Sequence, residues 1–176
     1  MASVALKVTP TKAVMVHAVT SYEDPIKKMI LAKLWSDSIA PVYLAELMWQ
    51  RTVLKHLDFD VLIPVPAHWY RTMRRGFNQA ELIADKLSQL SGKPVMRALK
   101  RVKATRFQSS LEPQQRQENV SGVFKIQDNY KERLQGKYII IVDDLLTTGA
   151  TIQELAKELY KAKPASISVV VAARAK

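Results

Sequence analysis

Residues 139–151 read IIIVDDLLTTGAT, and this stretch decides the fold. Its first four residues are apolar and β-branched, which is typical of a strand that is buried on both faces of a sheet. Beyond the stretch, apolar residues recur at helical spacing, at Ile152, Leu155, Ala156 and Leu159. The segment is therefore predicted to run strand, loop, helix. The loop would lie at the carboxyl end of a buried strand, where open α/β sheets place their ligand crevice.

The loop has the composition of an anion site, because it combines hydroxyls, backbone N–H groups and the positive end of a helix dipole. Its residues are Thr147, Thr148, Gly149, Ala150 and Thr151. The acids just upstream, Asp143 and Asp144, would repel a bare phosphate but suit ligand hydroxyls or a hydrated Mg²⁺. The pattern indicates a sugar phosphate. The alternative is that the acids only end a strand and that Thr151 only caps a helix.

A cluster of arginines lies between another predicted strand and helix. The strand spans residues 60–65, and Pro64 and Pro66 require it to be an edge strand or to end there. The helix spans residues 79–90, with Asn78 and Glu81 at its start and Gly92 after its end. Three arginines in this position suit a diphosphate through forked hydrogen bonds, or pair with surface acids. They are Arg71, Arg74 and Arg75.

Residues 101–122 are polar and show no sustained apolar period. A loop of this length is usually a functional lid or a disordered linker. It carries Lys103, Arg106 and Arg116, so a lid that closes over an anionic ligand is the favoured interpretation. A solvated linker is the alternative.

The N-terminal third predicts a strand at residues 13–19, a helix from Ile26 to Leu34 and a second helix from Pro41 to His56. These helices are expected to pack over the active-site side of the sheet. The histidines, including His17, are not at metal-ligand spacing and are expected at the surface or at helix caps.

The composition narrows the class of protein. The chain has 176 residues, about the length of one domain, and no cysteine, which excludes disulfides and thiolate zinc ligands. It has 27 Lys and Arg against 16 Asp and Glu, a formal charge of +11 that favours polyanionic partners. No apolar run reaches the length of a membrane span, and the start is too polar for a signal peptide, so we expect a cytoplasmic protein without membrane insertion.

IIIVDDLLTTGAT resembles the phosphoribosyl pyrophosphate (PRPP) signature of type I phosphoribosyltransferases. Two further blocks resemble the ComF family of competence proteins: DVLIPVPAHWYRTMRRGFNQAELIA at residues 60–84 and RVKATRFQSSLEPQQRQENVSGVF at residues 101–124. The resemblance implies an α/β fold with a parallel sheet flanked by helices. It implies a single domain over residues 1–176, with an N-terminal hood at 1–57 and the core at 58–176. Many ComF relatives also carry a four-cysteine zinc module, which these 176 residues lack.

The resemblance also implies residue roles. Asp143 and Asp144 would face the ribose hydroxyls and hold Mg²⁺ through water, and they would form the catalytic centre with Arg106 and Lys103. Residues 147–151 would hold the 5-phosphate and the three arginines the pyrophosphate. The lid would use Gln108, Arg116 and Asn119.

Three functions stay open. The first is a Mg²⁺-dependent phosphoribosyltransferase with an unknown nitrogenous acceptor. The second is a module that binds single-stranded DNA, and the third is a regulator that senses PRPP without turnover. The resemblance implies a link to DNA uptake and to other competence proteins. The oligomeric state is open, with a homodimer among the options.

Overall fold

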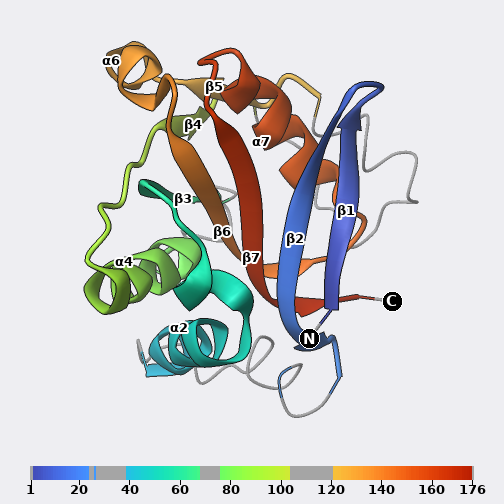
Figure 1. Ribbon diagram of the computed structural model, residues 1–176, viewed down its shortest axis with the longest axis vertical. Coiled ribbons are helices and arrows are strands. Elements are labelled where there is room, and N and C mark those ends of the chain that lie inside the picture. The colour runs from blue at the N-terminus through green and yellow to red at the C-terminus, as the bar shows by residue number, and fades with distance from the viewer. Residues whose placement is uncertain (1, 24–25, 27–38, 68–75, 104–120, 176) are drawn as a thin grey trace.

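The structure, a computed structural model, describes residues 2–23, 26, 39–67, 76–103 and 121–175. Five strands form one sheet in the order β1-β2-β7-β6-β3 (Figure 1). β1 is antiparallel to β2, and the other neighbours are parallel. The bounds are β1 (Ala2–Thr9), β2 (Lys12–Ser21), β7 (Ser166–Arg174), β6 (Tyr138–Leu146) and β3 (Val61–Pro64). A separate hairpin consists of β4 (Leu99–Arg101) and β5 (Phe124–Ile126).

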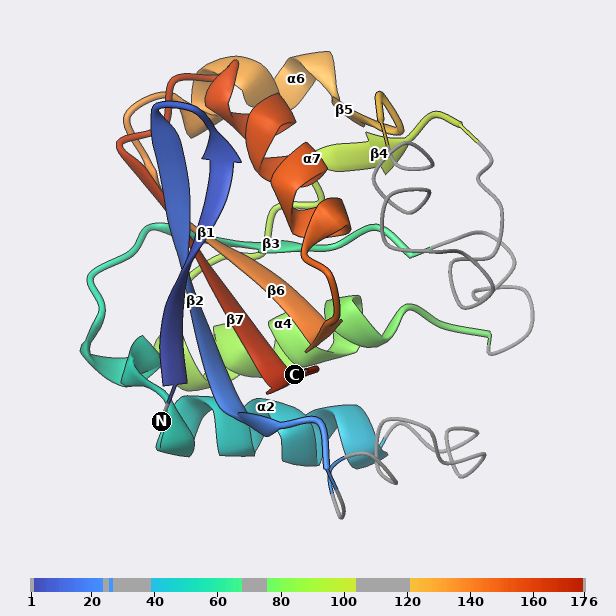
Figure 2. The same cartoon turned by 90° about the vertical axis from the view of Figure 1, so that its right-hand side faces the viewer.

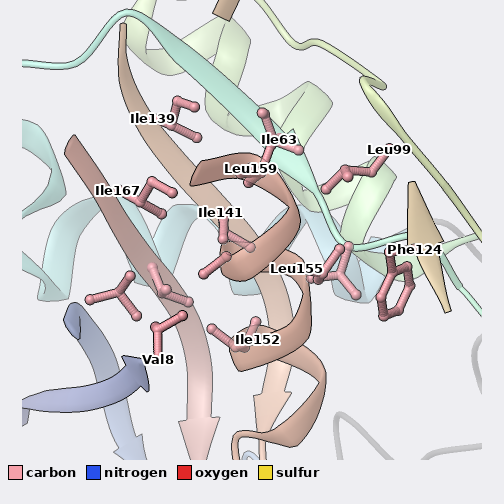
Figure 3. Close-up of a cluster of buried hydrophobic side chains, with 14 of the residues drawn as sticks. Val8, Ile63, Leu99, Phe124, Ile139, Ile141, Ile152, Leu155, Leu159 and Ile167 are labelled. Carbon is pink, nitrogen blue, oxygen red and sulfur yellow. The ribbon is translucent and has the colours of Figure 1, made fainter. Parts of the chain in front are cut away.

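Helices cover both faces of the sheet, which confirms the expected α/β fold. They are α2 (Ile39–Arg51), α4 (Gln79–Ser91), α6 (Asp128–Lys131) and α7 (Ala150–Tyr160), with 3-10 turns η2 (Val53–His56) and η4 (Glu132–Leu134). On one face Ile139 and Ile141 of β6 share a buried cluster with α7 (Figure 3). On the other face Ile140 and Val142 pack with α4 and α2, which lie next to each other (Figure 2). β6 is therefore buried on both sides, as its apolar run predicts.

β6 is longer than its apolar run, because β7 continues to pair with it up to Leu146, opposite Arg174. Asp143 and Asp144 consequently lie inside the strand, and the loop begins only after Leu146. On the other side β3 ends at Pro64, opposite Val142. Both predicted alternatives hold, because β3 is an edge strand and also ends at Pro64. Among the described residues, the end of β6 that carries the acids therefore has a strand neighbour only in β7.

α4 confirms the predicted helix almost residue for residue. Asn78 caps it by accepting a hydrogen bond from the Ala80 N–H at 3.2 Å, and its amide donates to Glu81 at 3.0 Å. Gly92 ends the helix in the left-handed conformation, with φ at 70°.

The N-terminal region differs from its prediction in two respects. β2 contains the expected strand, but β1 was not predicted. The expected helix from Pro41 to His56 is broken at Thr52, whose hydroxyl donates to the Met48 carbonyl at 2.6 Å and accepts from the Leu54 N–H at 3.2 Å. This capping starts η2 in place of continuing α2. Residues 27–34 of the other predicted helix lie outside the described residues.

The expectation of a surface or capping position for His17 is wrong. Its side chain is only 9% exposed and its Nδ1 lies 2.9 Å from the Ser3 hydroxyl of the neighbouring strand. β1 covers this position, which explains why reasoning that lacked β1 left His17 at the surface. β1 and β2 form a second hairpin, and both of its strands belong to the same sheet as the core strands.

Candidate functional site

The candidate site lies at the carboxyl ends of the parallel strands. The register pairs Arg174 of β7 with both Ser21 of β2 and Leu146 of β6, so these strands end side by side. Two hydrogen bonds of 2.8 Å fix the edge, from the Tyr22 N–H to the Arg174 carbonyl and from the Ala175 N–H to the Leu146 carbonyl. The loop of residues 147–149 starts at this edge, which is where α/β sheets bind ligands.

Gly149 sets the geometry of the loop. Its φ of 81° and ψ of −4° are left-handed, and it is the N-cap of α7 without a side-chain capping bond. The Gln153 N–H donates to the Gly149 carbonyl at 2.8 Å, which closes the first helical turn. The first N–H groups of a helix have no acceptor inside the helix, so they form a ready anion site. Thr151 lies inside α7, and the alternative in which it caps the helix is therefore wrong.

The hydroxyl residues at the start of the loop are accessible. Thr147 and Thr148 are exposed, whereas Gly149 and Ala150 are buried. The Thr148 hydroxyl lies 3.5 Å from the Ala150 N–H, which is the long limit of a hydrogen bond. The helix start thus places a buried backbone behind two exposed hydroxyls, an arrangement that suits a phosphate which approaches from solvent.

The two acids are half-buried at the end of β6. The Asp143 carboxylate accepts a hydrogen bond from the Asp144 N–H at 2.9 Å, which orients it along the strand. Burial raises the pKa of the Tyr22 hydroxyl, and the negative charge of Asp144 raises this pKa further. Asp144 therefore acts electrostatically on Tyr22, a residue that the sequence did not single out as part of the site.

The donors at this edge fit a Mg²⁺ ion that arrives with its ligand. Carboxylate oxygens are the hard donors that Mg²⁺ prefers, and it typically uses one or two of them together with substrate phosphates. Among the residues that the structure describes, no group of three or more His, Cys, Asp and Glu side chains forms a complete metal cage. Asp143 and Asp144 are thus suited to share a Mg²⁺ with a phosphorylated ligand.

Most of the other predicted site residues lie outside the described part of the chain. They are Arg71, Arg74, Arg75, Arg106, Gln108, Arg116 and Asn119. Lys103 is described and exposed, and its Nζ lies 3.2 Å from the position that a Cβ on Gly122 would occupy. The Val102 N–H also donates to the Val123 carbonyl at 2.7 Å. The two ends of the predicted lid are therefore neighbours.

The C-terminal end of that predicted lid is bonded to the helix of the phosphate loop. The Gly122 N–H donates to the Glu154 carboxylate of α7 at 2.6 Å. One turn further along the helix, Glu158 accepts from the Ile126 N–H of β5 at 3.3 Å. Sequence reasoning did not identify either contact, because both residues belong to the polar face of an ordinary amphipathic helix.

β1 also contributes residues that were missed. A Cβ on Gly149 would lie 2.8 Å from Leu6 Cδ1, so the Leu6 side chain packs directly on the loop. The Gln153 side-chain amide donates to the Lys7 carbonyl at 2.9 Å. The only signal for this strand was the polar and apolar alternation of ASVALKVT.

Within the described ranges, every helix is too short or too polar to cross a membrane.

Three curated relatives are similar to this chain. Competence protein F of Haemophilus influenzae is 36% identical over 117 residues, which cover 66% of this chain and 51% of the relative. Competence protein ComFC of Bacillus subtilis is 37% identical over 114 residues, or 61% of this chain and 42% of the relative. DNA utilization protein YhgH of Escherichia coli K12 is 34% identical over 111 residues, or 62% and 47%. The chain spans about half the length of these relatives.

Solved structures support the fold. The glutamine PRPP amidotransferase of B. subtilis, complexed with ADP and GMP, superposes with a TM-score of 0.52 at 16% identity. The match covers 76% of this chain and 26% of the amidotransferase.

The family model described as phosphoribosyl transferase domain matches residues 72–176, which include the acids and the phosphate loop. With the relatives above, this match shows that the chain belongs to the phosphoribosyl transferase domain family, as a ComF-type member.

Proposed function

We propose that the protein binds PRPP together with Mg²⁺ at the carboxyl edge of the sheet and transfers its phosphoribosyl group to a nitrogenous acceptor. One observation carries the proposal. Asp143 and Asp144 lie near the carboxyl end of the buried strand β6, and a left-handed Gly149 opens a helix only a few residues later. Groups that can accept hydrogen bonds from ribose hydroxyls and groups that can donate to a phosphate thereby lie on one continuous strand, loop and helix unit. We place this activity in the cytoplasm.

The chemistry follows from the charges that this reaction develops. Cleavage of the bond between C1 of the ribose and pyrophosphate leaves positive charge on the sugar and negative charge on the departing group, so catalysis requires orientation and electrostatics. The carboxylates of Asp143 and Asp144 accept hydrogen bonds from the ribose hydroxyls and face the developing positive charge. The N–H groups at the start of α7 hold the 5-phosphate. Bound Mg²⁺ supplies charge neutralisation of the leaving group.

We assign the other sequence-predicted residues to the same reaction; of these, only Lys103 lies within the described part of the chain. Arg71, Arg74 and Arg75 are proposed to bind the pyrophosphate, and Arg106 with Lys103 to stabilise its departure. Gln108, Arg116 and Asn119 are proposed to close the lid over the ligand, which excludes water from the reacting centre.

Calorimetry tests whether the acids bind the ribose and Mg²⁺ while the loop binds the phosphate. In Asp143→Asn with Asp144→Asn, PRPP binding should lose its Mg²⁺-dependent part, whereas ribose 5-phosphate should retain most of its affinity. The matched control is Asp128→Asn with Glu132→Gln, which removes two exposed negative charges on α6 and η4, before β6 begins. The control should bind PRPP like the wild type. Unchanged Mg²⁺-dependent binding in a folded acid variant would refute the assignment, and binding without turnover would favour a PRPP sensor.

A specific feature favours a second function, binding of single-stranded DNA. In the β4–β5 hairpin the exposed Lys100 and Lys125 lie directly opposite each other. Like charges at opposed positions destabilise a strand pair, and a phosphate backbone would relieve this repulsion. Lys103 extends the positive charge along the chain. The printed names of the relatives, competence and DNA utilization proteins, agree with a DNA-handling role.

Oligonucleotide titration at two salt concentrations tests this second function. Lys100→Glu with Lys125→Glu should weaken binding and flatten its salt dependence by about 0.7 in the log–log slope for each phosphate that the protein no longer neutralises. Lys55→Glu with Lys131→Glu makes the same change of charge at two other exposed positions and serves as the control. If both pairs weaken binding equally, the hairpin has no special role and only net charge matters.

A further inference from the structure

The side chain of Leu6 occupies the space beside Gly149. A Cβ on Gly149 would meet Leu6 Cδ1 at 2.8 Å and Cδ2 at 3.1 Å, which is closer than ordinary contact. Leu6 is itself partly buried against the core between α7 and the sheet. The Leu6 side chain therefore lies directly against the loop and limits how far the loop backbone can move toward β1.

Hydrogen bonds join the β1–β2 hairpin to α7 at two further points. The Gln153 side-chain amide, one turn into the helix, donates to the Lys7 carbonyl at 2.9 Å. At the far end of the helix the Tyr160 hydroxyl donates to the Ala13 carbonyl at 3.3 Å, and the Lys12 ammonium lies 4.2 Å from the centre of the Tyr160 ring. The hairpin thus follows α7 from its N-terminus to its last residue.

A helix N-terminus binds an anion well only if its N–H groups are held in the correct orientation and position relative to the anion. Gly149 gives the loop unusual backbone freedom, because a residue without Cβ has a wide choice of conformations. The neighbouring Thr147 and Thr148 are exposed and provide little packing of their own. The contacts from β1 are therefore the constraint that limits movement of the loop on this side.

We propose that β1 positions the phosphate loop, with Leu6 as the positioning residue and the Gln153 to Lys7 hydrogen bond as its support. This inference rests on the proposed function, since it concerns the site for the 5-phosphate. It adds a contribution from residues 2–9, which lie outside the matched family region of residues 72–176. Leu6 packs against the loop at Gly149, so its effect on the site is transmitted through this residue.

The experiment compares two truncations on the same strand. Leu6→Ala removes the packing contact with the loop, whereas Val4→Ala removes a neighbouring side chain that packs against the same core. Both variants should lower the melting temperature. Only Leu6→Ala should weaken ribose 5-phosphate and PRPP, by an equal factor of about ten, which corresponds to one weakened hydrogen bond to a charged group. Leu6→Met, which refills the volume, should restore the affinity.

Hydrogen exchange of the free protein provides a readout that needs no ligand. The amides of residues 148–153 should exchange faster in Leu6→Ala than in Val4→Ala or the wild type. Wild-type affinity and wild-type exchange in Leu6→Ala would overturn the inference and leave the proposed function intact. Equal loss of affinity in both alanine variants would also overturn it, because general destabilisation would then explain the effect. If the wild type binds neither ligand, the proposed function is wrong and the exchange rates alone decide whether β1 holds the loop.

Discussion

Replacement of Gly149 by alanine should destabilise the protein for two separable reasons. The φ of 81° is left-handed, which costs an alanine about 1 to 2 kcal/mol. The new Cβ would also lie 2.8 Å from Leu6 Cδ1, and such overpacking typically costs about 1 to 3 kcal/mol. The flexible end of Leu6 absorbs part of this overlap, so we expect a total loss of about 2 to 3 kcal/mol in the free energy of unfolding.

Gly92→Ala isolates the backbone contribution. Gly92 has a φ of 70°, but no atom of the described residues lies within 4 Å of the position of its Cβ. This variant should therefore lose only about 1 to 2 kcal/mol. The double variant Leu6→Ala with Gly149→Ala should be more stable than the sum of the single changes predicts, with a coupling of about 1 kcal/mol, because the overlap is gone.

Urea unfolding curves of these variants provide the measurement, with an unchanged m value as the sign that each comparison is valid. Equal losses for Gly149→Ala and Gly92→Ala would refute the reasoning about the Leu6 contact. Strict additivity in the double variant would refute it independently.

Three further predictions concern the scaffold. Burial lowers the pKa of His17 below 6.5, so the unfolded chain takes up the proton first and stability should fall as the pH drops through this value. His17→Gln should remove that part of the pH dependence in urea unfolding, and an unchanged slope would contradict the assignment. Arg97→Leu removes an ion pair to Asp85 at 2.8 Å, but the side chain is 50% exposed, so the loss should be at most about 1 kcal/mol and should vanish in high salt. Thr52→Val deletes a buried hydroxyl with two hydrogen bonds and should cost about 1 to 2 kcal/mol by thermal unfolding, whereas no loss would exclude the capping role.

The parts of the fold that the sequence predicts are those with strong local signals. Residues 139–142 are continuously apolar, and the spacing of Ile152 and Leu155 is helical, so β6 and α7 follow directly. Asn78 and Gly92 mark the two ends of α4 by their own chemistry. These features need no knowledge of distant residues, which is why they were predicted closely.

The parts that were missed depend on distant partners. β1 is an edge strand with both polar and apolar residues and carries no strong local strand signal. Its place in the sheet depends on pairing with β2. The contact between Leu6 and Gly149 and the bond between Gly122 and Glu154 join segments far apart in the chain. The extension of β6 through Asp143 and Asp144 likewise depends on β7. The elements with strong local signals, β6, α7 and α4, were therefore predictable from the sequence, whereas β1 and its contacts with the loop were not.

Hydrogen exchange with and without PRPP and Mg²⁺ tests the central claim most directly, because it reports where the ligand binds. Ligand should slow exchange at the end of β6 and in the loop, over residues 143–151, and should leave the amino-terminal ends of the strands unchanged. Ribose 5-phosphate should protect residues 148–151 but should have less effect at Asp143 and Asp144. Saturating PRPP that leaves residues 143–151 unprotected would contradict the account.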